Sequence, residues 1–254
     1  MTEIYPPYGG VLLCGGKGSR LEPVNREGIP KSLFKVGGRE LMRYSLDALP
    51  QSIVQRLVFA VDYKAEEIRS WVLRQGLPHT LQFSEQSEPG VLAAIQSGAA
   101  MVQEDHMVTC NTDEIRTRLN MAEVVNFHQH MGRLATMVVC PSNRLYRHRL
   151  IEVREHDQLV THSTLKPIEY KNNPDAVGLV NTGLLLVDRR ALEYVDPGHS
   201  RDWSGLIDPL CEMGQLGAFV SESMRYYNVG TPEELQDVEA SLAKLGPSGH
   251  IYTN

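Results

Sequence analysis

The sequence has few cysteines and no long hydrophobic run, and both shortages narrow the class of protein. None of the four cysteines forms a Cys-x-x-Cys pair. We therefore expect reduced thiols in the core of a cytoplasmic protein. No apolar run approaches the length of a membrane span, and the first residues lack the basic and apolar regions of a signal peptide. These features predict a protein with no membrane partner.

Basic residues are fewer than acidic ones, 25 against 31. The formal net charge is −6, which argues against broad nucleic-acid binding. A single phosphate site needs only local positive charge, so the acidic balance does not exclude one. No Ser/His/Asp set and no nucleophilic cysteine arrangement can be argued from spacing. The 254 residues contain no internal repeat and no low-complexity linker, and we predict a single domain.

The first informative stretch is a glycine-rich loop. An apolar run from Val11 to Cys14 predicts a short buried strand. It is followed by three glycines: Gly15, Gly16 and Gly18. Glycines let the backbone approach a ligand closely, and consecutive N–H groups in such a turn suit phosphate oxygens. Arg20 and Lys31 add positive charge, so the stretch predicts a strand that ends in a phosphate-binding loop.

Two familiar glycine loops fit poorly. The ATPase P-loop needs a Gly-Lys-Ser/Thr ending, which is absent. The dinucleotide fingerprint G-x-G-x-x-G would place a third glycine at Leu21. Pro23, Gly28 and Pro30 also interrupt the segment in which its helix should begin. A dinucleotide-dependent oxidoreductase therefore stays a weak alternative.

The first 140 residues alternate apolar strand-like runs with amphipathic helices, a rhythm typical of βαβ units and a mostly parallel sheet. In such sheets, ligands collect beyond the carboxyl ends of the strands. The turns at 15–18, 85–90 and 111–113 all follow predicted strands and should meet at one edge. From residue 149 the rhythm changes to a predicted hairpin, strands at 150–153 and 159–165.

Three further features could carry chemistry. Asp113 follows a strand and could hold Mg²⁺, a cation that prefers oxygen ligands, or it could simply cap a turn. Lys31 and Lys166 each follow or precede a proline and could contact phosphate or be solvated. The basic run at 146–149 is interpreted as a solvated loop.

The series Gly-Gly-x-Gly-Ser-Arg-Leu, followed some ten residues later by Pro-Lys, resembles the sugar-1-phosphate nucleotidyltransferases. The likeness spans about residues 10 to 245. It implies a three-layer α/β/α Rossmann-like fold, with a nucleotide-binding half at 10–140 and a sugar-phosphate-binding half at 141–245. We expect residues 246–254 to form a loose tail.

The resemblance also implies roles for individual residues. The nucleotide would be bound by Leu13, Cys14, Gly15, Gly16, Gly18, Ser19, Glu85 and Gly90. The phosphates would contact Arg20 and Lys31, and Mg²⁺ would be held by Asp113 and Asn228. The sugar phosphate would be bound by Lys166, Asn181 and Gly183.

Two positions depart from the family pattern. Asn228 stands where an aspartate usually shares the metal, and its amide oxygen could coordinate without charge. Leu165 stands where a glutamate usually binds sugar hydroxyls. A modified sugar, a heptose or a cyclitol phosphate therefore becomes a more plausible acceptor.

The combined prediction is an enzyme that transfers a nucleoside monophosphate from an NTP to a sugar-type 1-phosphate, with release of pyrophosphate. Within the family the chain is most similar to heptose- and mannose-1-phosphate guanylyltransferases, which favours GTP. The alternative is a catalytically silent regulatory or scaffold member of the same fold. The number of metals and the oligomeric state, including a homo-oligomer, stay open.

Overall fold

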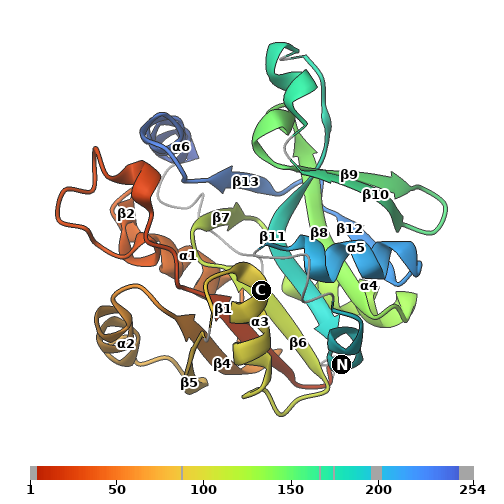
Figure 1. Ribbon diagram of the computed structural model, residues 1–254, viewed down its shortest axis with the longest axis horizontal. Helices are drawn as coiled ribbons and strands as arrows, with labels where there is room; N and C mark the ends of the chain where they lie inside the picture. Colours follow the sequence, from red (N-terminus) through yellow and green to blue (C-terminus); the bar gives the residue numbers. More distant parts are fainter. Residues whose placement is uncertain (1–4, 87, 166, 174, 196–201, 246–254) are drawn as a thin grey trace.

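A computed structural model describes residues 5–86, 88–165, 167–173, 175–195 and 202–245. Within them, strands from both halves of the chain form one large sheet in the order β5-β4-β1-β6-β11-β8-β12-β10-β9 (Figure 1). In chain order these strands are β1 Tyr8–Leu13, β4 Val54–Val61, β5 Thr80–Glu85, β6 His106–Asn111, β8 Ala135–Ser142, β9 Arg149–Arg154, β10 Leu159–Leu165, β11 Gly178–Asp188 and β12 Leu216–Val220.

The two halves of the chain contribute differently to this sheet. Strands β5, β4, β1 and β6 run parallel to one another, as the alternating pattern predicts. Strand β11 then runs antiparallel to both β6 and β8, and β12 is parallel to β8. The predicted hairpin is present as β9 and β10, and it extends away from the side of the molecule that carries α2. The sheet is therefore mixed, with its parallel part under the glycine loop.

Helices cover both faces, which makes three layers. Strand residues alternate between two apolar clusters, so that Leu12 faces one and Val11 the other. The first cluster includes side chains of α1 (Leu41–Asp47), α2 (Ala65–Leu73) and α4 (Met121–Met131). The second includes side chains of α3 (Val91–Ala99) and α5 (Ser204–Glu212). The predicted three-layer α/β/α fold is confirmed.

Two small sheets and one more helix complete the site edge. β2 (Lys35–Val36) pairs with β3 (Arg39–Glu40), and β7 (Glu114–Thr117) pairs with β13 (Arg225–Asn228). Helix α6 (Pro232–Leu245) packs beside β2 in a third apolar cluster. The last helix of the described chain thus contacts a strand from its N-terminal part. Short 3-10 helices lie at Ser19–Leu21, Lys31–Leu33, Leu145–Arg147, Ile168–Asn172 and Arg189–Tyr194.

Among the described residues, no helix combines the length and the apolar character that crossing a membrane requires. The predicted tail at 246–254 lies outside the described residues.

Candidate functional site

The glycine loop is tied to the Pro-Lys segment by close backbone contacts. The Lys31 amide donates to the Gly16 carbonyl oxygen at 3.3 Å. Gly18 has φ of +70°, and a Cβ there would lie 3.1 Å from the Cβ of Lys31. Glycine fits because it adopts positive φ readily and leaves room for the lysine. The segment that carries Lys31 therefore lies directly against the loop.

A cavity of about 330 Å³, which we call the glycine-loop cavity, opens at the carboxyl ends of β1 and β6. Its walls come from the glycine loop, the Pro-Lys segment, the start of α3 and the turn after β6, as predicted from the positions of these turns. The predicted residues that line it are Leu13, Cys14, Gly15, Gly16, Lys31, Gly90 and Asp113.

Lys31 and Asp113 form an ion pair inside this cavity. Lys31 is 7% exposed, whereas the Asp113 side chain keeps 33% of its surface open. Burial acts to raise the pKa of Asp113, but the charge and hydrogen bond of Lys31 outweigh it and lower the pKa below its ordinary value. The site therefore presents an ionised carboxylate and an ammonium to the same space.

Four other predicted nucleotide or phosphate residues do not line the glycine-loop cavity. Gly18 and Ser19 lie at the outer turn of the loop, and Ser19 is exposed. Arg20 is exposed and lies against Gly230, where a Cβ would come within 3.1 Å of its Nη2. Glu85 pairs with Arg69 at 2.8 Å and keeps most of its side chain in solvent. Their roles in binding stay predictions.

A second cavity of about 170 Å³, the middle cavity, adjoins the first through Asn111, which lines both. The predicted residues Asn181, Gly183 and Asn228 line it, together with Leu165. Lys166 lies outside the described residues. The structure thus brings three predicted sugar-phosphate or metal residues to one cavity beside Asp113.

The wall of the middle cavity contains a polar cluster that the sequence analysis missed. Glu114 accepts a hydrogen bond from Arg116 at 2.6 Å and from the Tyr226 hydroxyl at 2.9 Å. Arg116 is 1% exposed. Burial raises the pKa of Glu114, and the charge of Arg116 opposes this shift. In the sequence, the only signal for this cluster was the position of Arg116 close to Asp113. Because arginines are usually exposed, that position gave no reason to expect a buried one.

Gly183 makes room for this cluster. It has φ of +64°, and a Cβ there would overlap Glu114 Oε2 and Asn111 Nδ2. Its amide donates to Asn181 Oδ1 at 2.8 Å. The Asn-x-Gly motif therefore shapes the cavity wall through its backbone, in addition to any contact with a ligand.

The basic run at 146–149 is not the solvated loop that we expected. Arg149 is 6% exposed, and its guanidinium donates to Ser163 and Ser204 at 3.0 and 2.5 Å. Arg147 and His148 line the middle cavity beside it. Strand β9 begins at Arg149 and turns this segment inward, a consequence of pairing that composition alone does not reveal.

Of the two predicted metal ligands, one lies on a strand and the other just before one. Asp113 directly precedes β7, and Asn228 is the register partner of Glu114 on β13. A carboxylate and an amide are oxygen donors of the kind that Mg²⁺ prefers. No group of three or more His, Cys, Asp or Glu side chains in the described part of the chain could hold a metal ion. The two residues would supply a divalent cation with part of its oxygen ligands.

Comparison with known proteins places this chain in a family. The family model described as nucleotidyl transferase matches residues 9–244. A mannose-1-phosphate guanyltransferase of Debaryomyces hansenii is 25% identical over 231 residues, which are 89% of this chain and 62% of the relative. One of Saccharomyces cerevisiae is 24% identical over 253 residues, 94% of this chain and 66% of the relative. The chain thus spans less than two thirds of the length of these relatives.

Solved structures share the fold. A Bacillus anthracis structure named as a glucose-1-phosphate thymidylyltransferase in complex with sucrose has a TM-score of 0.79 at 20% identity, covering 92% of this chain and 94% of that one. HddC from Yersinia pseudotuberculosis complexed with GMP-PN has a TM-score of 0.70 at 22% identity, covering 92% and 99%. With a family model that matches nearly its whole length, the chain belongs to the nucleotidyl transferase family.

Proposed function

We propose that this protein transfers a nucleoside monophosphate from an NTP to a sugar-type 1-phosphate and releases pyrophosphate. The observation that carries this proposal is the pair of adjoining cavities. One is formed by the glycine loop with Lys31, the other by Asn181, Gly183 and Asn228. Asn111 borders both, and Asp113 directly precedes β7 next to this border. Two substrates bound in these cavities would meet beside Asp113.

The chemistry needs no covalent enzyme intermediate. A phosphate oxygen of the acceptor attacks the α-phosphorus of the NTP, the new P–O bond forms, and the bond to pyrophosphate breaks. The attacking oxygen is already anionic, so no strong general base is required. Catalysis is then positioning and stabilisation of negative charge in the transition state.

Lys31 is the residue best placed to stabilise that charge. Its ammonium is held by Asp113 at the edge of the glycine-loop cavity. Bound Mg²⁺ would supply further positive charge at the phosphates, with Asp113 and Asn228 as its protein ligands. We assign Lys31 to the α-phosphate and Arg20 to the β- and γ-phosphates. The exposed guanidinium of Arg20 beside Gly230 is open to such a contact.

For the base, we propose GTP, because the similar relatives are named guanyltransferases. For the acceptor, Leu165 on the wall of the middle cavity favours a 1-phosphate whose hydroxyls differ from those of an ordinary hexose. The four cysteines form no disulfide, which agrees with a reaction in the reducing cytoplasm.

The test is a screen of pyrophosphate release that crosses GTP, CTP, UTP, dTTP and ATP with sugar, heptose and cyclitol 1-phosphates, with and without Mg²⁺. Metal-dependent release with one pair would support the proposal and name both substrates. A folded protein that binds an NDP-sugar tightly but releases no pyrophosphate with any pair would instead indicate a regulatory member of the family.

A further inference from the structure

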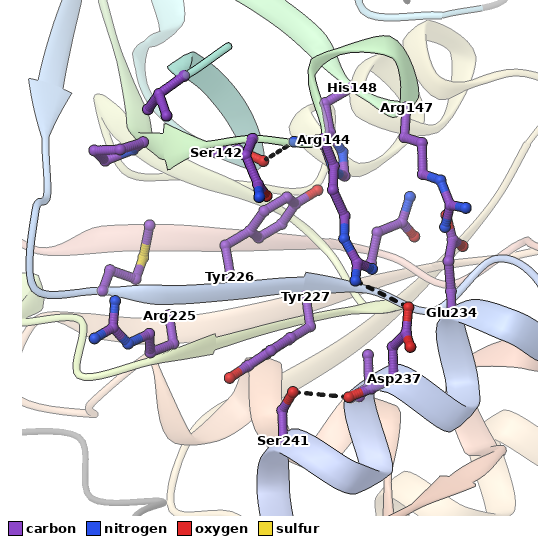
Figure 2. Close-up of a pocket in the computed structure, with 16 residues that line it drawn as sticks. Ser142, Arg144, Arg147, His148, Arg225, Tyr226, Tyr227, Glu234, Asp237 and Ser241 are labelled. Carbon is purple, nitrogen blue, oxygen red and sulfur yellow. Dashed lines mark hydrogen bonds and ion pairs between the residues drawn. The ribbon is translucent and has the colours of Figure 1, made fainter. Parts of the chain in front are cut away.

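A third cavity of about 430 Å³, the outer cavity, lies beyond the middle one. The end of β8 with the loop after it, β13 and the outer helix α6 form its walls. Figure 2 shows Arg144 reaching from that loop to Asp237 on α6, and Tyr226 and Tyr227 leaving β13 on opposite sides. Asn228 is its only predicted site residue among those described, so the reaction outlined above leaves this space unused.

The three cavities form a row. The outer cavity shares four lining residues with the middle cavity: Arg147, His148, Tyr226 and Asn228. Among the described lining residues, it shares none with the glycine-loop cavity. A group that enters the outer cavity from the active site therefore comes from the acceptor side and not from the nucleotide. The middle cavity alone, at about 170 Å³, is small for a ligand site.

The charges of the outer cavity favour an anion. Its lining contains three arginines and two carboxylates. Arg144 pairs with Asp237 at 2.9 Å and Arg147 with Glu234 at 3.2 Å. The guanidinium of Arg225 makes no hydrogen bond or ion pair with any residue that the structure describes. One positive charge is thus left in excess, on a side chain whose five donors suit a phosphate or carboxylate.

We infer that the outer cavity binds the far end of the acceptor, and that this end carries a second anionic group, a phosphate or a carboxylate. The inference rests on the proposed function, because it takes the middle cavity as the place of the sugar ring. The side chains of Tyr227, Ser142 and Asn143 also line the cavity and add hydrogen-bonding groups, whereas the Tyr226 hydroxyl donates to Glu114.

Binding measurements test this inference separately from turnover. Calorimetry in the presence of Mg²⁺ and a non-hydrolysable GTP analogue would compare mannose 1-phosphate, mannose 1,6-bisphosphate and mannuronic acid 1-phosphate. We expect one of the two ligands that carry a second anionic group to bind roughly tenfold more tightly than mannose 1-phosphate. Such a gain corresponds to one charge-assisted contact. Whichever of them gains identifies the anionic group as phosphate or carboxylate.

Two variants locate the contact. Arg225→Ala removes the excess charge from an exposed strand position, and Ser241→Trp fills the cavity from the partly exposed face of α6. Both should bring the affinity for the preferred ligand down to that for mannose 1-phosphate. Arg74→Ala, an exposed arginine at the end of α2, is the matched control and should leave the preference intact.

Equal affinity of the wild-type protein for all three ligands would overturn the inference. So would a preference that both variants retain. If no pyrophosphate is released but the binding preference is present and both variants abolish it, the proposed reaction is wrong. The inference that the outer cavity binds the second anionic group is then still supported.

Discussion

At the scale of single residues, the pairing of Lys31 with Asp113 is the centre of the site. Each of the two side chains is assigned a partner that arrives with the nucleotide: an α-phosphate for the lysine and a metal for the aspartate. Their mutual contact holds both side chains in place and lowers the pKa of Asp113, and the partly exposed Asp113 carboxylate stays accessible from the cavity. We therefore propose that the pair holds the site ready before substrate binds.

Lys31→Ala should reduce kcat by a factor of about 10² to 10³, the usual effect of removing one group that stabilises transition-state charge. Asp113 keeps a third of its surface in solvent, so folding should suffer little. Lys17→Ala is the control, because Lys17 is an exposed lysine of the same loop. Steady-state kinetics and thermal unfolding measure both effects, and full activity of the Lys31 variant would refute its assignment.

Asn228→Asp should tighten metal binding. A second carboxylate near Asp113 adds one negative charge to the proposed ligand set, and we expect the affinity for Mn²⁺, used as a probe, to rise roughly tenfold. Electron paramagnetic resonance measures the free metal directly, without any turnover. Asn126→Asp, at an exposed site on α4, controls for the change in net charge. The same affinity in both variants would argue against Asn228 as a ligand.

His128 should make stability depend on pH. Its ring is buried, where Nδ1 lies 2.9 Å from Thr136 Oγ1. Burial, helped by His106 and opposed by Asp188, lowers its pKa from 6.5 to about 4. Between these two pH values, His128 is therefore protonated in the unfolded chain but neutral in the folded protein. The free energy of unfolding should fall by about 3 kcal/mol as the pH drops from 6.5 to 4.

The measurement is urea unfolding across this pH range for the wild type and His128→Asn, which retains a polar group for Thr136. The variant should lack this part of the decline. If both proteins lose stability with the same slope, the proton uptake belongs to other groups.

At the scale of elements, β11 brings the backbone of Gly183 against the Glu114 cluster. Gly183→Ala should cost about 3 kcal/mol of stability, since it combines backbone strain at positive φ with overpacking against Glu114 and Asn111. Gly76→Ala has a similar φ of +61° but open space around it, so it should cost only about 1 kcal/mol. Denaturant unfolding of the two variants measures the difference. Equal losses would show that the cavity wall is not tightly packed at Gly183.

The same elements show how far the sequence alone could lead. Local signals were enough for β1 and its glycine loop, the alternation of strands and helices in the first 140 residues and the β9–β10 hairpin, because apolar periodicity and turn residues are local. They were not enough for β7, whose sequence Glu-Ile-Arg-Thr carries no clear strand pattern and which exists by pairing with β13. The position of β11 between β6 and β8 also depends on contacts between distant parts of the chain, which periodicity does not encode.

The site shows the same division. The resemblance to the family predicted seven residues of the glycine-loop cavity and three of the middle cavity. It missed Glu114, Arg116 and Arg149, which are charged residues that become buried only because partners from distant strands and loops satisfy them. Their burial is a property of the assembled fold.

At the scale of the whole molecule, the row of three cavities is the feature that organises function. The parallel half of the sheet supplies the glycine-loop cavity, and the mixed half with β13 and α6 supplies the other two. The order that we propose for the nucleotide, the sugar ring and the second anionic group follows this division of the chain. We propose that nucleotidyl transfer takes place where the first two cavities meet, beside Asp113.

The most direct test of that transfer follows the α-phosphorus of the nucleotide. The protein would be incubated with Mg²⁺, the acceptor that the screen identifies and GTP labelled at either the α- or the γ-phosphate. We expect the α-label in an NDP-sugar and the γ-label in pyrophosphate, in equal amounts. The Lys31→Ala variant should form much less of both products. Release of γ-label as inorganic phosphate, with no α-label joined to the acceptor, would contradict nucleotidyl transfer.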